Sequence, residues 1–286
     1  MILEPYRSRS LNVLLAGLAQ RDTHEWEILA SNFYGGWGEE SFEFILEERV
    51  VGKEAELEAA KARLRARQAY AIERYHDKET VALKSWEYEG DKLRASFVPS
   101  DDLTYLAYRE MEGAKGSIPL GCSALEVNFF VVTHDNFVLL AQGTDKRSFA
   151  CSARAGMGEV RDGKIDAVGA ACRGAREELG LRLARNSVVF NGWGVHRQEG
   201  QCALWGLVYI EQDWSELWLG DDRWQRVSAI PFEVEACLRA MAEGQWEYGA
   251  LLGLLEALIY KHGLDTVFET ARAQANSPIE KTGRKS

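Results

Sequence analysis

The chain has 286 residues, a formal net charge of −10, 46% hydrophobic residues and 27% charged residues. This composition is typical of a globular protein, and the length suffices for one large domain or for two. The acidic balance argues against nonspecific binding to nucleic acid, which requires a basic surface that neutralises phosphates. A small-molecule nucleotide derivative stays compatible as a partner, because a bound divalent cation reverses the local field.

The cysteines and the apolar segments bear on the cellular compartment of the protein. The five cysteines show no C-x-x-C spacing, which favours a reducing cytoplasm and argues against structural zinc. An apolar run at residues 11–18 follows two arginines, but it is short and Glu4 precedes it, so we interpret it as an amphipathic segment packed on the domain rather than a leader. No stretch approaches the about 20 apolar residues that span a membrane. We therefore expect a cytoplasmic protein with no membrane partner.

Residues 1–112 are predicted to form a small α+β unit. Alternating apolar and aromatic residues predict strands, and Gly-containing pairs between them predict tight turns. A long stretch rich in Ala, Glu, Arg and Lys without Gly or Pro predicts a surface helix. The predicted elements are a hairpin around Gly35-Gly36 (residues 26–33 and 41–46), a helix (residues 53–76) and a hairpin around Glu89-Gly90-Asp91 (residues 81–88 and 92–98).

A second unit is predicted for residues 113–272, followed by a polar, flexible tail at residues 273–286. Its strand and helix patterns alternate, which indicates an α/β domain. The predicted elements are a hairpin around His134-Asp135 (residues 123–133 and 136–142), a Gly-rich loop (residues 156–163), a helix ending at Leu179, two strands (residues 188–195 and 202–210) and two helices (residues 232–242 and 245–261).

The helix that ends at Leu179 has clear end signals. Asp166 is a good N-cap, and Gly180 suits the left-handed position that ends a helix. A spacing of 100° per residue places four apolar residues on one narrow face: Val168, Cys172, Ala175 and Leu179. The same spacing places Gly174, Glu177 and Glu178 on the opposite face.

The C-terminal half of this helix carries a family resemblance. Residues 173–181 (RGAREELGL) resemble the second half of the box that Nudix hydrolases share, G-x5-E-x7-R-E-U-x-E-E-x-G-U, where U is aliphatic. The residues that match are Arg173, Glu177, Glu178, Gly180 and Leu181, with Ala175 as a small variant of U. The flanking pattern, a hairpin before and paired strands after, is also similar to the family.

Three positions depart from the box. Gly174 stands where the family has Glu, and Ile165 stands where the first Glu is expected, although Asp166 is adjacent. The leading Gly is displaced, since Glu159 takes its place and Gly158 lies one residue upstream. The resemblance therefore covers about half of the chain, from residue 120 to about residue 261, with a divergent box.

The resemblance implies a Nudix-type mixed sheet sandwiched by helices. It also implies that Glu177 and Glu178 hold Mg²⁺ or Mn²⁺, ions that prefer oxygen ligands and bridge a diphosphate. Asp166 or Glu159 would supply a replacement carboxylate, although helix capping and surface solvation are the alternative roles of these two residues. Arg173 would orient loop carboxylates and so support the catalytic site structurally rather than take part in the chemistry. The alternative for Glu177 and Glu178 is a solvated surface pair.

Other candidates for ligand contacts have ordinary explanations. Trp193 and Trp205 suit stacking on a base, but tryptophans in strands are usually core residues. His196 and Arg197 suit phosphate contacts, but they also suit a polar strand end. The Gly-rich loop lacks GxxxxGK[ST] and is not a P-loop.

The first hypothesis is a metal-dependent pyrophosphohydrolase acting on a nucleoside diphosphate linked to another moiety. A nucleotide-sugar is a narrower candidate, because a dissimilar N-terminal unit before a divergent box resembles Nudix proteins that act on UDP-sugars. The alternative is a catalytically degenerate Nudix-fold nucleotide-binding or regulatory protein, since Gly174 interrupts the acidic face. A third hypothesis is an interaction scaffold. The sequence leaves a homodimer open.

Overall fold

The structure is a computed structural model of the chain. It describes residues 26–31, 36–47, 54–67, 80–89, 92–112, 125–142, 148–156, 160–161, 164–196, 202–217 and 227–276. The predicted apolar segment at residues 11–18, the candidate ligand Glu159, Arg197 and most of the predicted tail lie outside these residues.

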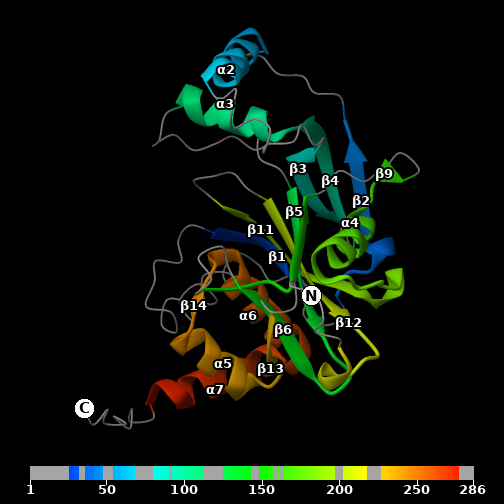
Figure 1. Cartoon of the computed structure of the whole chain (residues 1–286), viewed down its shortest axis with the longest axis vertical. Coiled ribbons are helices and arrows are strands. Elements are labelled where there is room, and N and C mark those ends of the chain that lie inside the picture. Colours follow the sequence, from blue (N-terminus) through cyan, green and yellow to red (C-terminus); the bar gives the residue numbers. More distant parts are fainter. Residues whose placement is uncertain are drawn as a thin grey trace.

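Two sheets dominate the described part of the chain (Figure 1). The larger sheet comprises nine described strands: β1 (Trp26–Ser31), β5 (Leu125–Val132), β6 (Phe137–Gln142), β7 (Ser148–Ala150), β8 (Ala153–Gly156), β11 (Val188–His196), β12 (Cys202–Tyr209), β13 (Val227–Pro231) and β14 (Gln245–Trp246). Its order is β1-β11-β12-β5-β6-β7-β14, with β8 on β5 and β13 on β6. Since β12 pairs parallel with β5 and most other pairs are antiparallel, the sheet is mixed.

The smaller sheet has the order β3-β4-β2-β10-β9. Its strands are β2 (Phe42–Leu46), β3 (Thr80–Glu89), β4 (Lys92–Ser100), β9 (Val160–Arg161) and β10 (Lys164–Ile165). The helical elements are η1 (Glu39–Ser41), α2 (Glu54–Arg67), α3 (Asp102–Glu112), α4 (Ala167–Gly174), η2 (Ala175–Leu179), η3 (Arg185–Ser187), η4 (Trp214–Glu216), α5 (Val234–Glu243), α6 (Tyr248–His262) and α7 (Leu264–Asn276). Mixed sheets and helices together make the described fold α/β, as the sequence predicts.

The predicted hairpin around Gly35-Gly36 is wrong. β1 pairs antiparallel with β11 in the larger sheet, whereas β2 pairs parallel with β4 and antiparallel with β10 in the smaller one. Apolar alternation specifies a strand and its buried face but carries no information about the partner strand. Each sheet therefore takes strands from both sides of residue 112, where we predict a boundary between two units.

Other predicted elements are confirmed. β3 and β4 form the hairpin around residues 89–91, with Glu89 opposite Lys92. β5 and β6 are joined through His134-Asp135, with Val132 opposite Val138. The predicted strands after the box are β11 and β12, which pair antiparallel. The sequence does not predict α3, β7, β8, β10, β13, β14 or α7, and β9 lies inside the predicted Gly-rich loop. α7 extends to Asn276 and thus beyond the predicted start of the tail.

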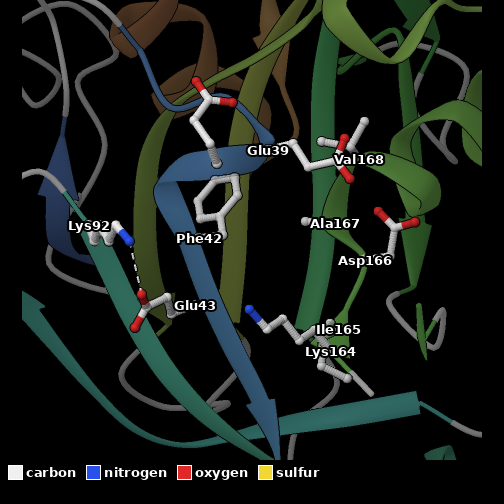
Figure 2. A pocket seen from close by; sticks show the side chains of 10 residues that line it. Glu39, Phe42, Glu43, Lys92, Lys164, Ile165, Asp166, Ala167 and Val168 are labelled. Carbon is white, nitrogen blue, oxygen red and sulfur yellow. Dashed lines mark hydrogen bonds and ion pairs between the residues drawn. The ribbon is translucent and has the colours of Figure 1, made fainter. Parts of the chain in front are cut away.

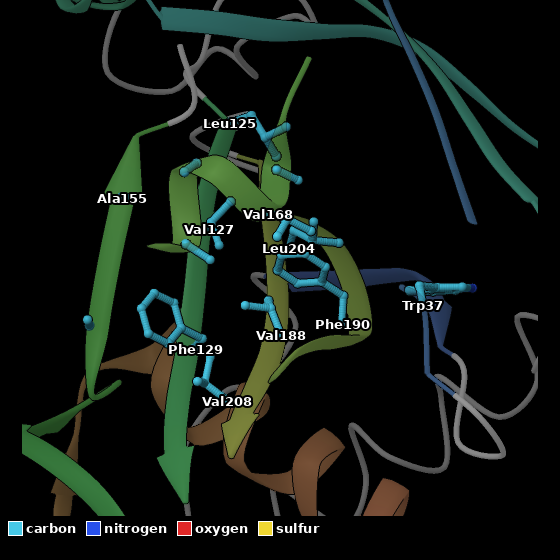
Figure 3. Close-up of a cluster of buried hydrophobic side chains, with 14 of the residues drawn as sticks. Trp37, Leu125, Val127, Phe129, Ala155, Val168, Val188, Phe190, Leu204 and Val208 are labelled. Carbon is cyan, nitrogen blue, oxygen red and sulfur yellow. The ribbon is translucent and has the colours of Figure 1, made fainter. Parts of the chain in front are cut away.

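The core lies on both faces of the larger sheet. Strand β5 shows the division, because Val127 and Phe129 pack with α4 on one face and Phe130 packs with α6 on the other. Figure 3 shows the α4 side, where side chains of β5, β11 and β12 gather around Val168. Trp193 and Trp205 are fully buried, so the interpretation of both as core residues is confirmed. Within the described residues, no helix combines the length and apolarity needed to cross a bilayer.

Candidate acidic site at the end of the α4 helix

The helix that follows Asp166 forms both of its ends as its sequence predicts. The Oδ1 atom of Asp166 accepts a hydrogen bond from the N–H of Gly169 at 2.8 Å, so Asp166 is the N-cap of α4. Gly180 has φ 72°, the left-handed conformation that glycine adopts at low cost. The predicted apolar face is buried at Val168, Ala175 and Leu179. Local chemistry thus fixes both ends of the element that carries the candidate site.

The helix widens into one π-helical turn, η2, over Ala175–Leu179. The N–H of Leu181 donates to the carbonyl of Ala175 at 3.1 Å beyond this turn. A π turn holds more residues than an α turn. The angles around the helix axis between Gly174 and the two glutamates, Glu177 and Glu178, therefore differ from those that 100° per residue gives. The predicted placement of Gly174 at the centre of the acidic face is therefore wrong. Gly174 is buried, whereas both glutamates are exposed.

Gly174 lies against the backbone of β8. A Cβ atom at this position would lie 3.0 Å from the Cβ of Ala155 and 3.1 Å from the carbonyl oxygen of Arg154. Both distances are tighter than ordinary van der Waals contact, so the missing side chain lets the helix approach the strand. Close packing against β8 therefore explains a glycine at position 174.

The two exposed glutamates are held by different groups. The N–H of Arg154 on β8 donates to Oε2 of Glu178 at 3.0 Å. Arg173 donates to Oε2 of Glu177 at 3.0 Å and to the carbonyl oxygen of Gly156 at 2.6 Å. The guanidinium of Arg173 thus links the helix to the end of β8 and orients Glu177.

The electrostatic environment of Glu178 disfavours its negative charge. Although the Glu178 side chain is exposed at the surface, the surrounding protein partly shields its carboxylate from water, which raises its pKa, and the nearby charge of Glu177 adds to this effect. The hydrogen bond from Arg154 and the positive charges of Arg154 and Arg173 oppose it. A carboxylate that is partly desolvated beside a second carboxylate favours a cation as its partner.

Asp166 is not brought to the glutamate pair. It lies at the opposite end of the helix, roughly 16 Å from Glu177 along the axis at about 1.5 Å per residue. The guanidinium of Arg185 donates to both oxygens of Asp166 at 2.7 and 2.9 Å, and to Glu39 at 2.7 and 3.0 Å. Among the described residues, no group of three or more His, Cys, Asp or Glu side chains is arranged to hold a metal ion.

A cavity of about 390 Å³ opens beside the N-terminal end of α4 (Figure 2). Its apolar residues are Phe42, Ile165, Ala167 and Val168, and its charged residues are Glu39, Glu40, Glu43, Lys92, Lys164 and Asp166. Several of these charges are already paired; the ammonium of Lys92 donates to Glu43 at 3.1 Å. The sequence offered no signal for this cavity, because its walls come from residues 39–43, 92 and 164–168.

Comparisons with known proteins add little to this geometry. No family model matches the chain, and no curated protein sequence matches it. Among solved structures, the chain is similar to a MutT/nudix family protein from Enterococcus faecalis, with 14% sequence identity over 59% of this chain and 86% of that one. The TM-score is 0.28, a value that carries no argument about fold or function.

Proposed function

We propose that the protein is a metal-dependent pyrophosphohydrolase that acts on a nucleoside diphosphate linked to another moiety. The observation that carries this proposal is the pair Glu177 and Glu178 in a π turn, with Glu178 fixed on β8 and partly desolvated. Single π turns inside helices are frequent at functional sites, and perturbed carboxylates cluster there too. A nucleotide-sugar is the narrower substrate class.

The residues present fit Mg²⁺ or Mn²⁺. Both ions prefer oxygen ligands, and the two carboxylates offer only oxygen. Mg²⁺ is usually held in proteins by one or two carboxylates, with substrate phosphates and water completing its shell. Two glutamates are therefore enough for this role, even though no third His, Cys, Asp or Glu side chain joins them among the described residues. Asp166, which pairs with Arg185 at the other end of the helix, is not needed for this pair of ligands.

Each residue of the site has a distinct task. Glu177 and Glu178 would hold the metal, which supplies neutralisation of the phosphates and a bound water of lowered pKa. The N–H of Arg154 keeps the Glu178 carboxylate at the end of β8. Arg173 holds Glu177 in place through its second contact with Gly156. The anchoring of both glutamates reduces the side-chain motion that metal binding would otherwise restrict.

The test combines hydrolysis with metal-dependent stability. Nucleotide-sugars, dinucleotides and nucleoside triphosphates are screened with Mg²⁺ and with Mn²⁺, using the parent and Glu178→Gln. We expect turnover to fall by several orders of magnitude in the variant, and the metal-induced rise in Tm to disappear, because a ligand bound only to the folded state stabilises it. Glu235→Gln, an exposed carboxylate on α5, is the matched control. Equal turnover in Glu178→Gln and the parent would remove Glu178 from the site.

A second candidate function is nucleotide binding without catalysis. The tight packing of Gly174 favours it, because the family's third helix carboxylate has no room here without displacing β8. Titration calorimetry measures the affinity for a nonhydrolysed nucleotide in the presence of metal. Together with the turnover screen, it distinguishes the two functions. Tight binding by a protein that turns over none of the screened substrates would support the binding protein and contradict the hydrolase.

A further inference from the structure

A carboxylate lies buried between α6 and the larger sheet, on the face opposite α4. Glu256 is fully buried in the middle of α6, among leucines of the same helix. The helix lies directly on the sheet there, since a Cβ at Gly253 would be 2.6 Å from Cδ1 of Trp205. An ionisable side chain in this position costs stability unless a partner or a proton neutralises it.

The sheet provides space for this side chain at Gly192. A Cβ at Gly192 would lie 3.2 Å from Cγ and 3.4 Å from Cδ of Glu256, and 3.2 Å from Cε3 of Trp205. Gly192 pairs with Ser31 of β1 on one side and with Trp205 of β12 on the other. The carboxyl group thus lies over one cross-strand row, next to the edge strand β1.

One hydrogen bond joins the side chain of Glu256 to β1. The hydroxyl of Ser31 donates to Oε1 at 3.0 Å, and Oε2 has no hydrogen-bond partner among the described residues. One hydroxyl donor does not compensate the burial of a charged carboxylate. Burial raises the pKa of Glu256 to about 8, and the Ser31 hydrogen bond offsets only part of this rise.

Charged groups near α6 do not supply the missing compensation. Strand alternation places these titratable or charged residues of the sheet on this side: Glu126 on β5, Arg154 on β8, His196 on β11 and Tyr209 on β12, with the thiol of Cys151 between β7 and β8. On α6 and just before it they are Glu247, Tyr260, Lys261 and His262. On α5 and α7 they are the exposed residues Glu235, Arg239, Glu243, Asp265, Glu269 and Arg272, together with the buried thiol of Cys237 on α5. Burial and the Ser31 contact are the causes that set the pKa of Glu256.

We propose that Glu256 is a proton-dependent lock on β1, which holds this edge strand on the sheet while the carboxyl group is neutral and releases it when the group ionises. β1 is the strand affected because it ends the sheet and pairs only with β11 among the described strands. Its pairing also contains a register shift between Ile28 and Ala30. Figure 1 shows β1 beside β11, with α6 close to both.

The direction of the pH effect follows from the raised pKa. While β1 is paired with β11 (the closed state), burial favours the neutral form of Glu256. Its stabilising effect on β1 is therefore fully present below the ordinary pKa of glutamate, 4.5. This stabilisation of β1 decreases as pH rises toward about 8, where Glu256 ionises in the closed state as well. Above that pH the stabilisation is constant. Within this window the opening constant rises about tenfold per pH unit, because opening releases one proton.

Hydrogen exchange of backbone amides tests the lock on the full chain. Exchange rates of residues 26–31 are measured from pH 5 to pH 9 and divided by the intrinsic rates of the unfolded chain. We expect the resulting opening constant to rise about tenfold per pH unit and to level off near pH 8. Glu256→Gln keeps an acceptor for Ser31 and cannot ionise, so its opening constant stays flat. Glu269→Gln on α7 removes an exposed carboxylate and should retain the parent slope.

Three outcomes would overturn the proposal. The first is a flat pH profile for residues 26–31 in the parent, and the second is an unchanged slope in Glu256→Gln. The third is an equal rise at residues 204–208 in the middle of the sheet, which would mean global unfolding rather than release of β1. A ¹³C titration of the glutamate carboxyl groups in the parent gives a readout that needs no folded variant. A midpoint for Glu256 near 4.5 would exclude the lock.

Discussion

At the scale of single residues, Gly174 shows how tertiary contacts override local propensity. Helix propensity alone predicts that replacing this glycine stabilises the helix by roughly 1 kcal/mol. Yet the Cβ of any larger residue would press on Ala155 and on the carbonyl of Arg154 in β8. The neighbouring atoms include strand backbone, which yields less readily than a flexible side chain.

We expect Gly174→Ala to lower the free energy of unfolding by about 1 kcal/mol, because overpacking costs about 1–3 kcal/mol against the gain in propensity. Gly174→Glu should lower it further. Urea unfolding with linear extrapolation measures both, and Arg176→Ala, at an exposed position of η2, is the control. A Gly174→Ala variant as stable as the parent would show that β8 has room to move.

The sequence predicts the parts of the site that depend on neighbouring residues, but not those that depend on distant segments. Asp166 and Gly180 act through their immediate neighbours, so their capping roles could be predicted. The π turn has no comparable signature, and it changes which residues share a face. The contact between Glu178 and Arg154 depends on a strand 24 residues away, which the helix pattern does not reveal. The roles of Glu177, Glu178, Asp166 and Glu159 as metal ligands stay predictions.

At the scale of elements, Arg185 joins three short pieces of structure. Its guanidinium connects η3 to the N-terminal end of α4 through Asp166, and to η1 through Glu39. The bidentate geometry suits arginine, whose planar fork donates along parallel directions. The pKa of Arg185 is raised because both carboxylates stabilise its positive form.

Arg185→Ala should lower the free energy of unfolding by about 1 kcal/mol, a modest value because Glu39 is half exposed and water screens that pair. The loss should shrink in 1 M salt, where the Debye length is about 3 Å. Urea unfolding at low and high salt checks both points. Arg182→Ala, an exposed neighbour, provides the comparison. Equal losses at the two salt concentrations would indicate packing rather than charge.

Local sequence patterns predict strands but not always which strands pair with each other. The hairpins at residues 89–91 and 134–135 were predictable, because short turns bring adjacent strands together. The run at residues 26–33 has a similar pattern, but its partner β11 lies far along the chain. The cavity beside α4 escaped prediction for the same reason, since distant segments form its walls.

At the scale of the whole molecule, buried thiols report on the integrity of both core clusters. Cys202 lies on the α4 side of the sheet, and Cys151 and Cys237 lie on the α6 side. Burial raises the pKa of Cys151 and of Cys237 to about 12 and raises that of Cys202 as well. Since the thiolate is the nucleophile, all three should be inert in the folded protein.

We expect iodoacetamide at pH 8 to modify Cys172 slowly in the folded protein, because this thiol is only partly buried. Cys151, Cys202 and Cys237 should react only as urea unfolds the chain, and their midpoints should coincide if the two clusters unfold together. Mass spectrometry of peptides measures each site. An earlier midpoint for Cys237 than for Cys202 would show that the α6 side unfolds first.

The pairing of β1 with β11 has a consequence for the newly made chain. Trp26 pairs with His196, which is synthesised about 170 residues later. At about 5–20 residues per second, β1 leaves the ribosome roughly 10–30 s before its partner strand exists. During this interval the strand WEILAS has no native partner, and it is open to chaperones or to the same strand of a neighbouring nascent chain. Slower translation of residues 32–196 should therefore lower the soluble yield rather than raise it.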